Sequence, residues 1–73
     1  MAPKKLKLGN AVRRLRFDAD EMTQQELAEK VGVTRQTVAA IEKSKYSPSL
    51  ELAFCLAQVF DKQIGEVFWI EAE

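Results

Sequence analysis

The feature that most constrains the fold is a pair of short helical patterns with very little sequence between them. Thr23 and Glu26 have the spacing of a capping box, which predicts that a helix begins at Gln24. Gly32 can adopt the left-handed backbone conformation that often follows the end of a helix. We therefore expect the first helix of the pair to run from Gln24 to about Val31.

The second helix of the pair has its own start signal. Thr34 can cap a helix that we expect to run from Arg35 to about Lys43. Apolar residues recur at the spacing of one buried helical face, and they are Leu27, Ala28, Val31, Val33, Val38 and Ile41. Ala28 is small at the point where the two helices would cross closely. This is the pattern of a helix-turn-helix, which any other helical hairpin would have to match by chance at both caps and at all of these positions.

Three further helical segments are predicted on either side of this pair. Asn10 can cap a helix from about Ala11 to Asp18, and Ser49 can cap a longer one from Leu50 to about Phe60. The segment from Gln63 to about Val67 can form one more helical turn. The chain would then contain five helices.

Both ends of the chain carry strand signals. Lys5 to Leu8 alternate with a period of two, and Phe68 to Ala72 are rich in aromatic and β-branched residues. The simplest partner for each strand is the other, which predicts a small antiparallel ribbon. We therefore expect an all-α fold with a two-stranded ribbon made from the termini, and 73 residues leave room for one domain, 1–73.

The composition argues against several classes of function. The chain has no histidine and a single cysteine, Cys55, which argues against a zinc site, an internal disulfide and histidine-based acid–base catalysis. We find no glycine-rich phosphate loop and no pairing of a nucleophile with a base. We therefore expect no enzyme activity, no cofactor, no metal and no small-molecule ligand.

The net charge of zero hides an asymmetry along the chain. Residues 1–46 contain ten Lys and Arg but six Asp and Glu, whereas residues 47–73 contain one Lys and five acidic residues. A molecule with a basic front and an acidic back has a dipole that can orient it toward a polyanion. Uneven charge also arises by chance in small domains, so this observation supports nucleic-acid binding only weakly.

The stretch MTQQELAEKVGVTRQTVAAIEKSKYSPSLELA resembles the lambda-repressor-like, Cro-like (XRE-type) family of DNA-binding domains, and in particular its short stand-alone members. The resemblance covers about residues 10–69. It implies a five-helix DNA-binding domain that acts as a transcriptional regulator, usually as a homodimer. We expect the helix-turn-helix at about 24–43 and a dimerisation part at about 49–72.

The resemblance also implies roles for individual residues. Arg35 and Gln36 open the second helix of the pair, where family members read base edges, and their side chains match the acceptors of guanine and the edge of adenine. The residues expected to read bases are Arg35, Gln36, Thr37, Ala39 and Ala40. The residues expected to contact phosphates are Gln24, Lys43, Ser44, Lys45 and Tyr46. For Lys43 and Lys45, ordinary solvated lysine is the alternative.

Arginines in the first predicted helix are assigned differently from one another. Arg16 and Glu42 match an ion pair that the family often keeps, so we interpret Arg16 as part of the scaffold and not as a DNA contact. Arg13 and Arg14 are equally compatible with phosphate contacts and with an ordinary charged surface.

The predicted helix from Leu50 to Phe60 divides its apolar residues between two faces. One face carries Leu50, Ala53, Ala57 and Phe60, and the other carries Leu52, Leu56 and Val59. Because so small a domain has one core, we expect the second face to meet another subunit. The expected dimer surface consists of Leu52, Val59, Phe68, Trp69 and Ile70.

Taken together, these features predict a sequence-specific repressor that binds a palindromic operator as a homodimer. Its partners would be double-stranded DNA and a second copy of the chain, with half-sites about 34 Å apart. The longest apolar run has six residues, so we expect no membrane span, and we expect a cytoplasmic protein found at the nucleoid when bound to DNA. The alternatives are the antitoxin of a toxin–antitoxin pair, a protein-interaction module built on the same fold, and a ligand-sensing repressor that would need a partner protein to sense the signal.

Overall fold

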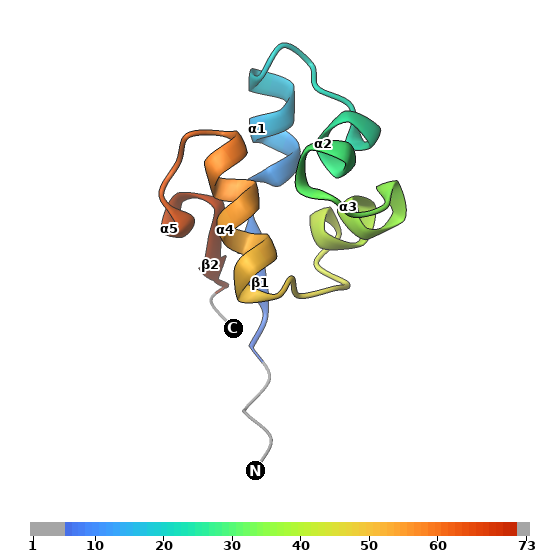
Figure 1. Ribbon diagram of the computed structural model, residues 1–73. Coiled ribbons are helices and arrows are strands. Elements are labelled where there is room, and N and C mark those ends of the chain that lie inside the picture. Colours follow the sequence, from blue (N-terminus) through green and yellow to red (C-terminus); the bar gives the residue numbers. More distant parts are fainter. Residues whose placement is uncertain (1–5, 72–73) are drawn as a thin grey trace.

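Helices make up most of the molecule, and its two short strands lie side by side near the ends of the chain (Figure 1). The computed structural model describes residues 6–71. Its elements are β1 (Leu8–Asn10), α1 (Val12–Asp18), α2 (Gln24–Val31), α3 (Arg35–Glu42), α4 (Leu50–Val59), α5 (Ile64–Val67) and β2 (Phe68–Ile70). This arrangement confirms the predicted fold class.

The local signals around the helix pair act as the sequence predicts. Thr23 Oγ1 accepts a hydrogen bond from the Glu26 amide at 3.0 Å, and Glu26 Oε1 accepts one from the Thr23 amide at 2.9 Å. Gly32 follows α2 with φ of 76°, in the left-handed region. Thr34 Oγ1 accepts from the Thr37 amide at 3.2 Å and caps α3, which ends at Glu42, one residue before the predicted end.

The core lies where α2 and α3 cross and where α1, α4 and α5 close over them. Leu27 and Ala28 of α2 are fully buried, and Val38 and Ile41 of α3 are 1% and 2% exposed. The other helices contribute four buried residues to the same cluster, namely Val12, Leu56, Ala57 and Val67. Burying one face of α3 in this way leaves its opposite face available at the surface.

The two strands form the predicted antiparallel ribbon, with Leu8 opposite Ile70 and Asn10 opposite Phe68. The strand β1 lies three residues later than the predicted Lys5–Leu8 segment, and both Lys5 and Ala72 fall outside the described residues. The shift has a physical reason in the pair between Gly9 and Trp69. A Cβ on residue 9 would overlap the indole nitrogen of Trp69, so glycine allows the indole to lie across the strand.

The start of α1 differs from its prediction. The helix begins at Val12 with Ala11 in the capping position, so Asn10 is not its cap. The Asn10 side chain instead bridges two elements. Its Oδ1 accepts from the Val12 amide at 3.1 Å, while its Nδ2 donates to the Ile41 carbonyl at 2.9 Å. Asn10 therefore ties the end of β1 to the end of α3.

The helix α4 does not have the two opposed apolar faces that its sequence predicts. Ala53, Leu56 and Ala57 are buried, and the flanking residues Leu52, Val59 and Phe60 pack against the same core. Because helical residues lie 100° apart, these residues form one broad buried face. Leu50, which was expected to be buried, is 71% exposed, and Phe54 is 48% exposed.

Candidate nucleic-acid interface

The first turn of α3 presents polar side chains at the surface. Arg35 and Gln36 are exposed, and no side-chain hydrogen bond or ion pair holds either of them within residues 6–71. The other three residues expected to read bases, Thr37, Ala39 and Ala40, are half-buried. The Thr37 hydroxyl lies 3.1 Å from the Thr34 hydroxyl, so it belongs to the cap of the helix. The exposed face of α3 therefore combines two long polar side chains, Arg35 and Gln36, with short side chains that end in methyl groups.

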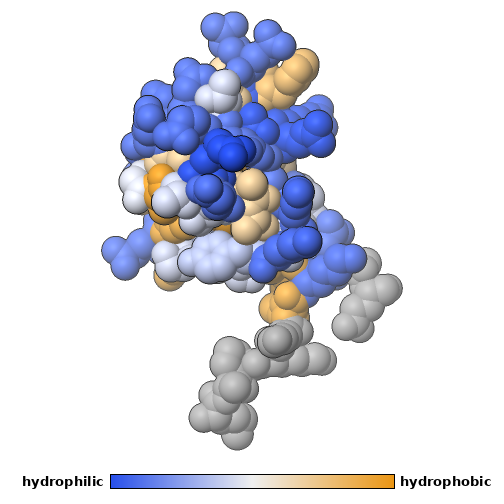
Figure 2. Space-filling view, turned by 90° about the vertical axis from the view of Figure 1, so that its right-hand side faces the viewer, coloured by the Kyte–Doolittle hydropathy of each residue, from blue (hydrophilic) through white to orange (hydrophobic). Residues whose placement is uncertain are grey.

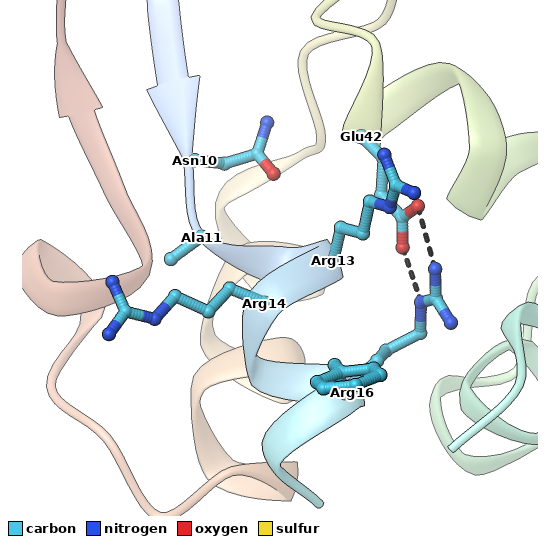
Figure 3. A pocket seen from close by; sticks show the side chains of 7 residues that line it. Asn10, Ala11, Arg13, Arg14, Arg16 and Glu42 are labelled. Carbon is cyan, nitrogen blue, oxygen red and sulfur yellow. Dashed lines mark hydrogen bonds and ion pairs between the residues drawn. The ribbon is translucent and has the colours of Figure 1, made fainter. Parts of the chain in front are cut away.

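The other end of α3 is clamped through the carboxylate of Glu42. Arg16 Nε lies 2.5 Å from Glu42 Oε2, and Arg16 Nη2 donates to Oε1 at 3.0 Å, as Figure 3 shows. The side chains of Arg16 and Glu42 are 15% and 6% exposed. A third donor of the same guanidinium, Nη1, reaches the Met22 carbonyl at 2.7 Å. Arg16 and Glu42 thus form a clamp that joins α1, the start of α2 and the end of α3.

Gln24 completes this clamp from the first position of α2. Its Nε2 donates to Glu42 Oε1 at 3.1 Å, which is a bracing contact to α3. Gln24 is half-buried at the first position of α2, the end of a helix where the dipole favours an anion. The hydrogen bond from the Thr23 amide lowers the pKa of Glu26, so the capping box remains ionised well below neutral pH.

The loop after α3 is fastened back onto the helix and onto the ribbon. Ser44 has φ of 58°, its amide donates to the Ile41 carbonyl at 2.9 Å, and the Lys45 amide donates to the Ala40 carbonyl at 2.9 Å. The Ser44 hydroxyl donates to the Leu8 carbonyl at 2.9 Å. Its one proton is therefore engaged within the chain, whereas Lys43, Lys45 and Tyr46 are exposed.

The surface around these residues is polar and open. Figure 2 shows that the face of the molecule on the side of α2 and α3 is hydrophilic over its upper part, with apolar and near-neutral side chains among the polar ones lower down. An open hollow of about 720 Å³ lies beside the clamp and is lined by Asn10, Ala11, Arg13, Arg14, Arg16, Phe17 and Glu42 (Figure 3). Three of the residues expected to touch DNA, Gln24, Ala39 and Lys43, line a second open depression together with Arg13, Arg16 and Glu42.

A family profile described as Helix-turn-helix matches residues 13–67, which is most of the chain. The match spans the capped helix pair, the clamp and α4. The chain belongs to the helix-turn-helix family. Its resemblance to the XRE-type branch, inferred above from the residues of α2 and α3, is confirmed.

Several relatives of this helix-turn-helix chain are known from distant organisms. The Bacillus subtilis protein YgzD, an uncharacterized HTH-type transcriptional regulator, is 55% identical over 51 residues, which cover 70% of this chain and 77% of YgzD. A regulator of the same description from Methanocaldococcus jannaschii is 54% identical over 50 residues, or 68% of this chain and 76% of its own. One from Archaeoglobus fulgidus is 50% identical over 52 residues, covering 71% and 73%.

The residues expected to form a dimer surface lie in two different environments. Leu52, Val59 and Phe68 are half-buried against the core of their own chain. Trp69 and Ile70 are 41% and 65% exposed. Sequence reasoning missed the exposed apolar side chains of α4, Leu50 and Phe54, because periodicity does not show which flank of a helix faces the core. No helix in the described part of the chain has the length and apolar character needed to cross a membrane.

Proposed function

We propose that this chain regulates transcription by binding DNA, and that the first turn of α3 reads the sequence from the major groove. One observation carries the proposal: Arg35 and Gln36 are exposed at one end of a helix whose other end is clamped by Arg16 and Gln24. A rigidly held helix with free polar side chains at its N-terminus is the recognition geometry of this motif. The names of the relatives from three organisms support the same conclusion.

The side chains on the exposed face of α3 would contact the bases in different ways. Arg35 would donate two hydrogen bonds to guanine, and Gln36 would pair with the edge of adenine. Ala39 and Ala40 are half-buried and present only methyl groups, so the helix can approach closely and can touch a thymine methyl. Thr37 would contact the edge of the same surface, with its hydroxyl shared with Thr34.

Phosphate contacts would come from the residues on both sides of α3. Gln24 lies at the N-terminus of α2, and Lys43, Lys45 and Tyr46 follow α3 with exposed side chains. Such contacts orient the protein on the duplex without reading its sequence. Ser44 would support them indirectly, because its hydroxyl fastens this loop to Leu8.

The active form would be a symmetric homodimer that represses transcription from a palindromic operator. One recognition helix reads too few base pairs to select a unique site, and two-fold pairing doubles the number read, with half-sites about 34 Å apart. The exposed apolar side chains of Trp69 and Ile70 support a contact between copies through the ribbon. Leu52 and Val59 would contribute from the rim of α4 with the part of their surface that remains accessible.

Selection of bound sequences from a randomised duplex pool tests this function. The wild type is run beside the double variant Arg35→Ala/Gln36→Ala and beside Gln58→Ala, which removes an exposed polar side chain from α4. We expect wild type and Gln58→Ala to enrich one two-fold symmetric motif that the double variant loses. Absence of enrichment by the folded wild type at low salt would show that the fold serves instead as a scaffold for a protein partner.

A further inference from the structure

Arg13 has no role in the clamp or on the recognition helix, yet it lies next to both. Together with parts of α2 and α3 it lines an open trough of about 340 Å³, formed by Arg13, Arg16, Gln24, Ala39, Glu42 and Lys43. The trough and the hollow of Figure 3 share three lining residues, Arg13, Arg16 and Glu42. Arg13 therefore borders both depressions.

The charges along this trough are not balanced. The carboxylate of Glu42 is compensated by Arg16 and accepts a further hydrogen bond from Gln24, so it offers little repulsion to an anion above it. Arg13 and Lys43 are exposed, and neither forms an ion pair with a carboxylate among residues 6–71. These two side chains give the trough its net positive charge.

The adjacent arginine faces a different part of the surface. In Figure 3 the Arg14 side chain points away from Glu42, toward the opposite side of α1 from Arg13. Arg14 Nε lies 3.9 Å from Asp18 Oδ2, one helical turn further along. It also lines a separate hollow near Lys62 and Glu66 of the C-terminal part. Arg13 and Arg14 thus both border the hollow of Figure 3, but only Arg13 lines the trough with Gln24 and Lys43.

We propose that Arg13 is a phosphate contact, which extends the DNA-binding surface from the helix-turn-helix onto α1. The inference rests on the proposed function. Gln24 and Lys43, both proposed phosphate contacts, line the same trough as Arg13. A sugar-phosphate chain that touches both residues runs along the trough and meets the Arg13 guanidinium at its outer end. Arginine suits this position because its planar guanidinium can donate two hydrogen bonds to one phosphate.

The salt dependence of operator binding tests the proposal with Arg14 as a matched control. The variants Arg13→Gln and Arg14→Gln each remove one exposed positive charge from α1 and keep a good helix former. On the duplex selected by the wild type, we expect Arg13→Gln to reduce the slope of log K against log salt by about 0.9 per protomer. For the two protomers of a bound dimer the slope changes by about 1.8, which is a change of about 12-fold in relative affinity between 50 and 200 mM salt. We expect Arg14→Gln to keep the wild-type slope and Arg13→Lys to restore it.

Neutral methylphosphonates, placed one at a time along the operator, then locate the contact. We expect one position per half-site at which the wild type and Arg14→Gln lose affinity while Arg13→Gln does not. The role of Arg13 would be overturned if the two glutamine variants had equal salt slopes. It would also be overturned if every methylphosphonate that weakens binding of the wild type weakened binding of Arg13→Gln as well. If the folded wild type binds no duplex at all, the proposed function itself fails, so the two failures are distinguishable.

Discussion

The Glu42 carboxylate of α3 bonds side chains from both α1 and α2. Its side chain is 6% exposed and accepts hydrogen bonds from two nitrogens of Arg16 and from Gln24. A buried carboxylate is tolerated because its partners replace the water that it has lost. The helix α3 is therefore held by charge compensation at its C-terminal end, opposite the end that carries Arg35 and Gln36.

Removing one partner of this ion pair should be much worse than removing both. We expect Arg16→Met to lower the free energy of unfolding by about 3 kcal/mol or more, because it leaves the Glu42 charge buried without its main partner. The double variant Arg16→Met/Glu42→Leu should recover a large part of that loss. Urea unfolding of the three proteins measures this, and an Arg16→Met variant as stable as the double variant would contradict it.

The capping box predicts how stability depends on pH. The pKa of Glu26 is held below its ordinary value of 4.5 in the folded chain, chiefly by the hydrogen bond from the Thr23 amide. A lowered pKa gives stability that is present above pH 4.5 and is lost as the pH falls through the folded pKa. Glu26→Gln keeps the geometry without the charge, so its stability should fall less steeply than that of the wild type below pH 4.5. Parallel curves from thermal unfolding at several pH values would contradict this.

At the scale of elements, the structure agrees with the sequence where the start and stop signals are local. The helix α2 has its predicted bounds and α3 its predicted start, because Thr23, Gly32 and Thr34 act within a few residues of their own positions. The residues proposed to read bases follow from the same signals, since the cap of α3 places Arg35 and Gln36 in its first turn.

The differences arise where a contact between distant parts of the chain decides the outcome. The strand β1 lies later than expected because Gly9 pairs with Trp69, 60 positions away. Ala11 takes the capping position of α1, while Asn10 bonds both the Val12 amide and the Ile41 carbonyl, and Ser44 uses its hydroxyl on Leu8. The bonds to Ile41 and Leu8 each join residues more than 30 positions apart, so no local pattern could have revealed them.

The ribbon depends on the close contact at Gly9, and its single tryptophan reports on it. We expect Gly9→Ala to destabilise the fold by about 1 kcal/mol, because the new methyl group would overlap the Glu71 carboxylate and the Trp69 indole nitrogen, and both side chains must shift. The tryptophan emission should move to longer wavelength as the ring becomes more exposed. Gly65→Ala is the control, because nothing lies within 4 Å of its Cβ position, and it should leave the emission unchanged. A neutral Gly9→Ala with unchanged emission would contradict this account of the ribbon.

At the scale of the whole molecule, the basic residues and the recognition helix belong to one part of the chain. Ten of the eleven Lys and Arg lie in residues 1–46, which include α1, α2 and α3. The C-terminal part is acidic, and it carries the exposed apolar residues Trp69 and Ile70. This distribution suits a molecule that turns its first half toward a polyanion and its last half toward a second copy.

A contact between copies through the ribbon predicts which exposed apolar residue matters. Ile70 and Phe17 are 65% and 66% exposed, so each can accept a lysine with little effect on folding. We expect Ile70→Lys to be a monomer with weakened binding to a palindromic duplex, and Phe17→Lys to remain a dimer. Sedimentation equilibrium at micromolar concentration distinguishes them. If both variants stay dimeric, or if the wild type is a monomer, the ribbon is not the interface.

A comparison of the wild type with Gln36→Ala tests most directly whether the first turn of α3 reads base edges. Their affinities are measured for the selected operator and for duplexes that each carry one changed base pair per half-site. We expect the wild type to discriminate by about 1–3 kcal/mol at each contacted position. Gln36→Ala should lose that discrimination at one position per half-site and keep it at the others. If Gln36→Ala retains the wild-type preference at every position, α3 is not the helix that reads the sequence.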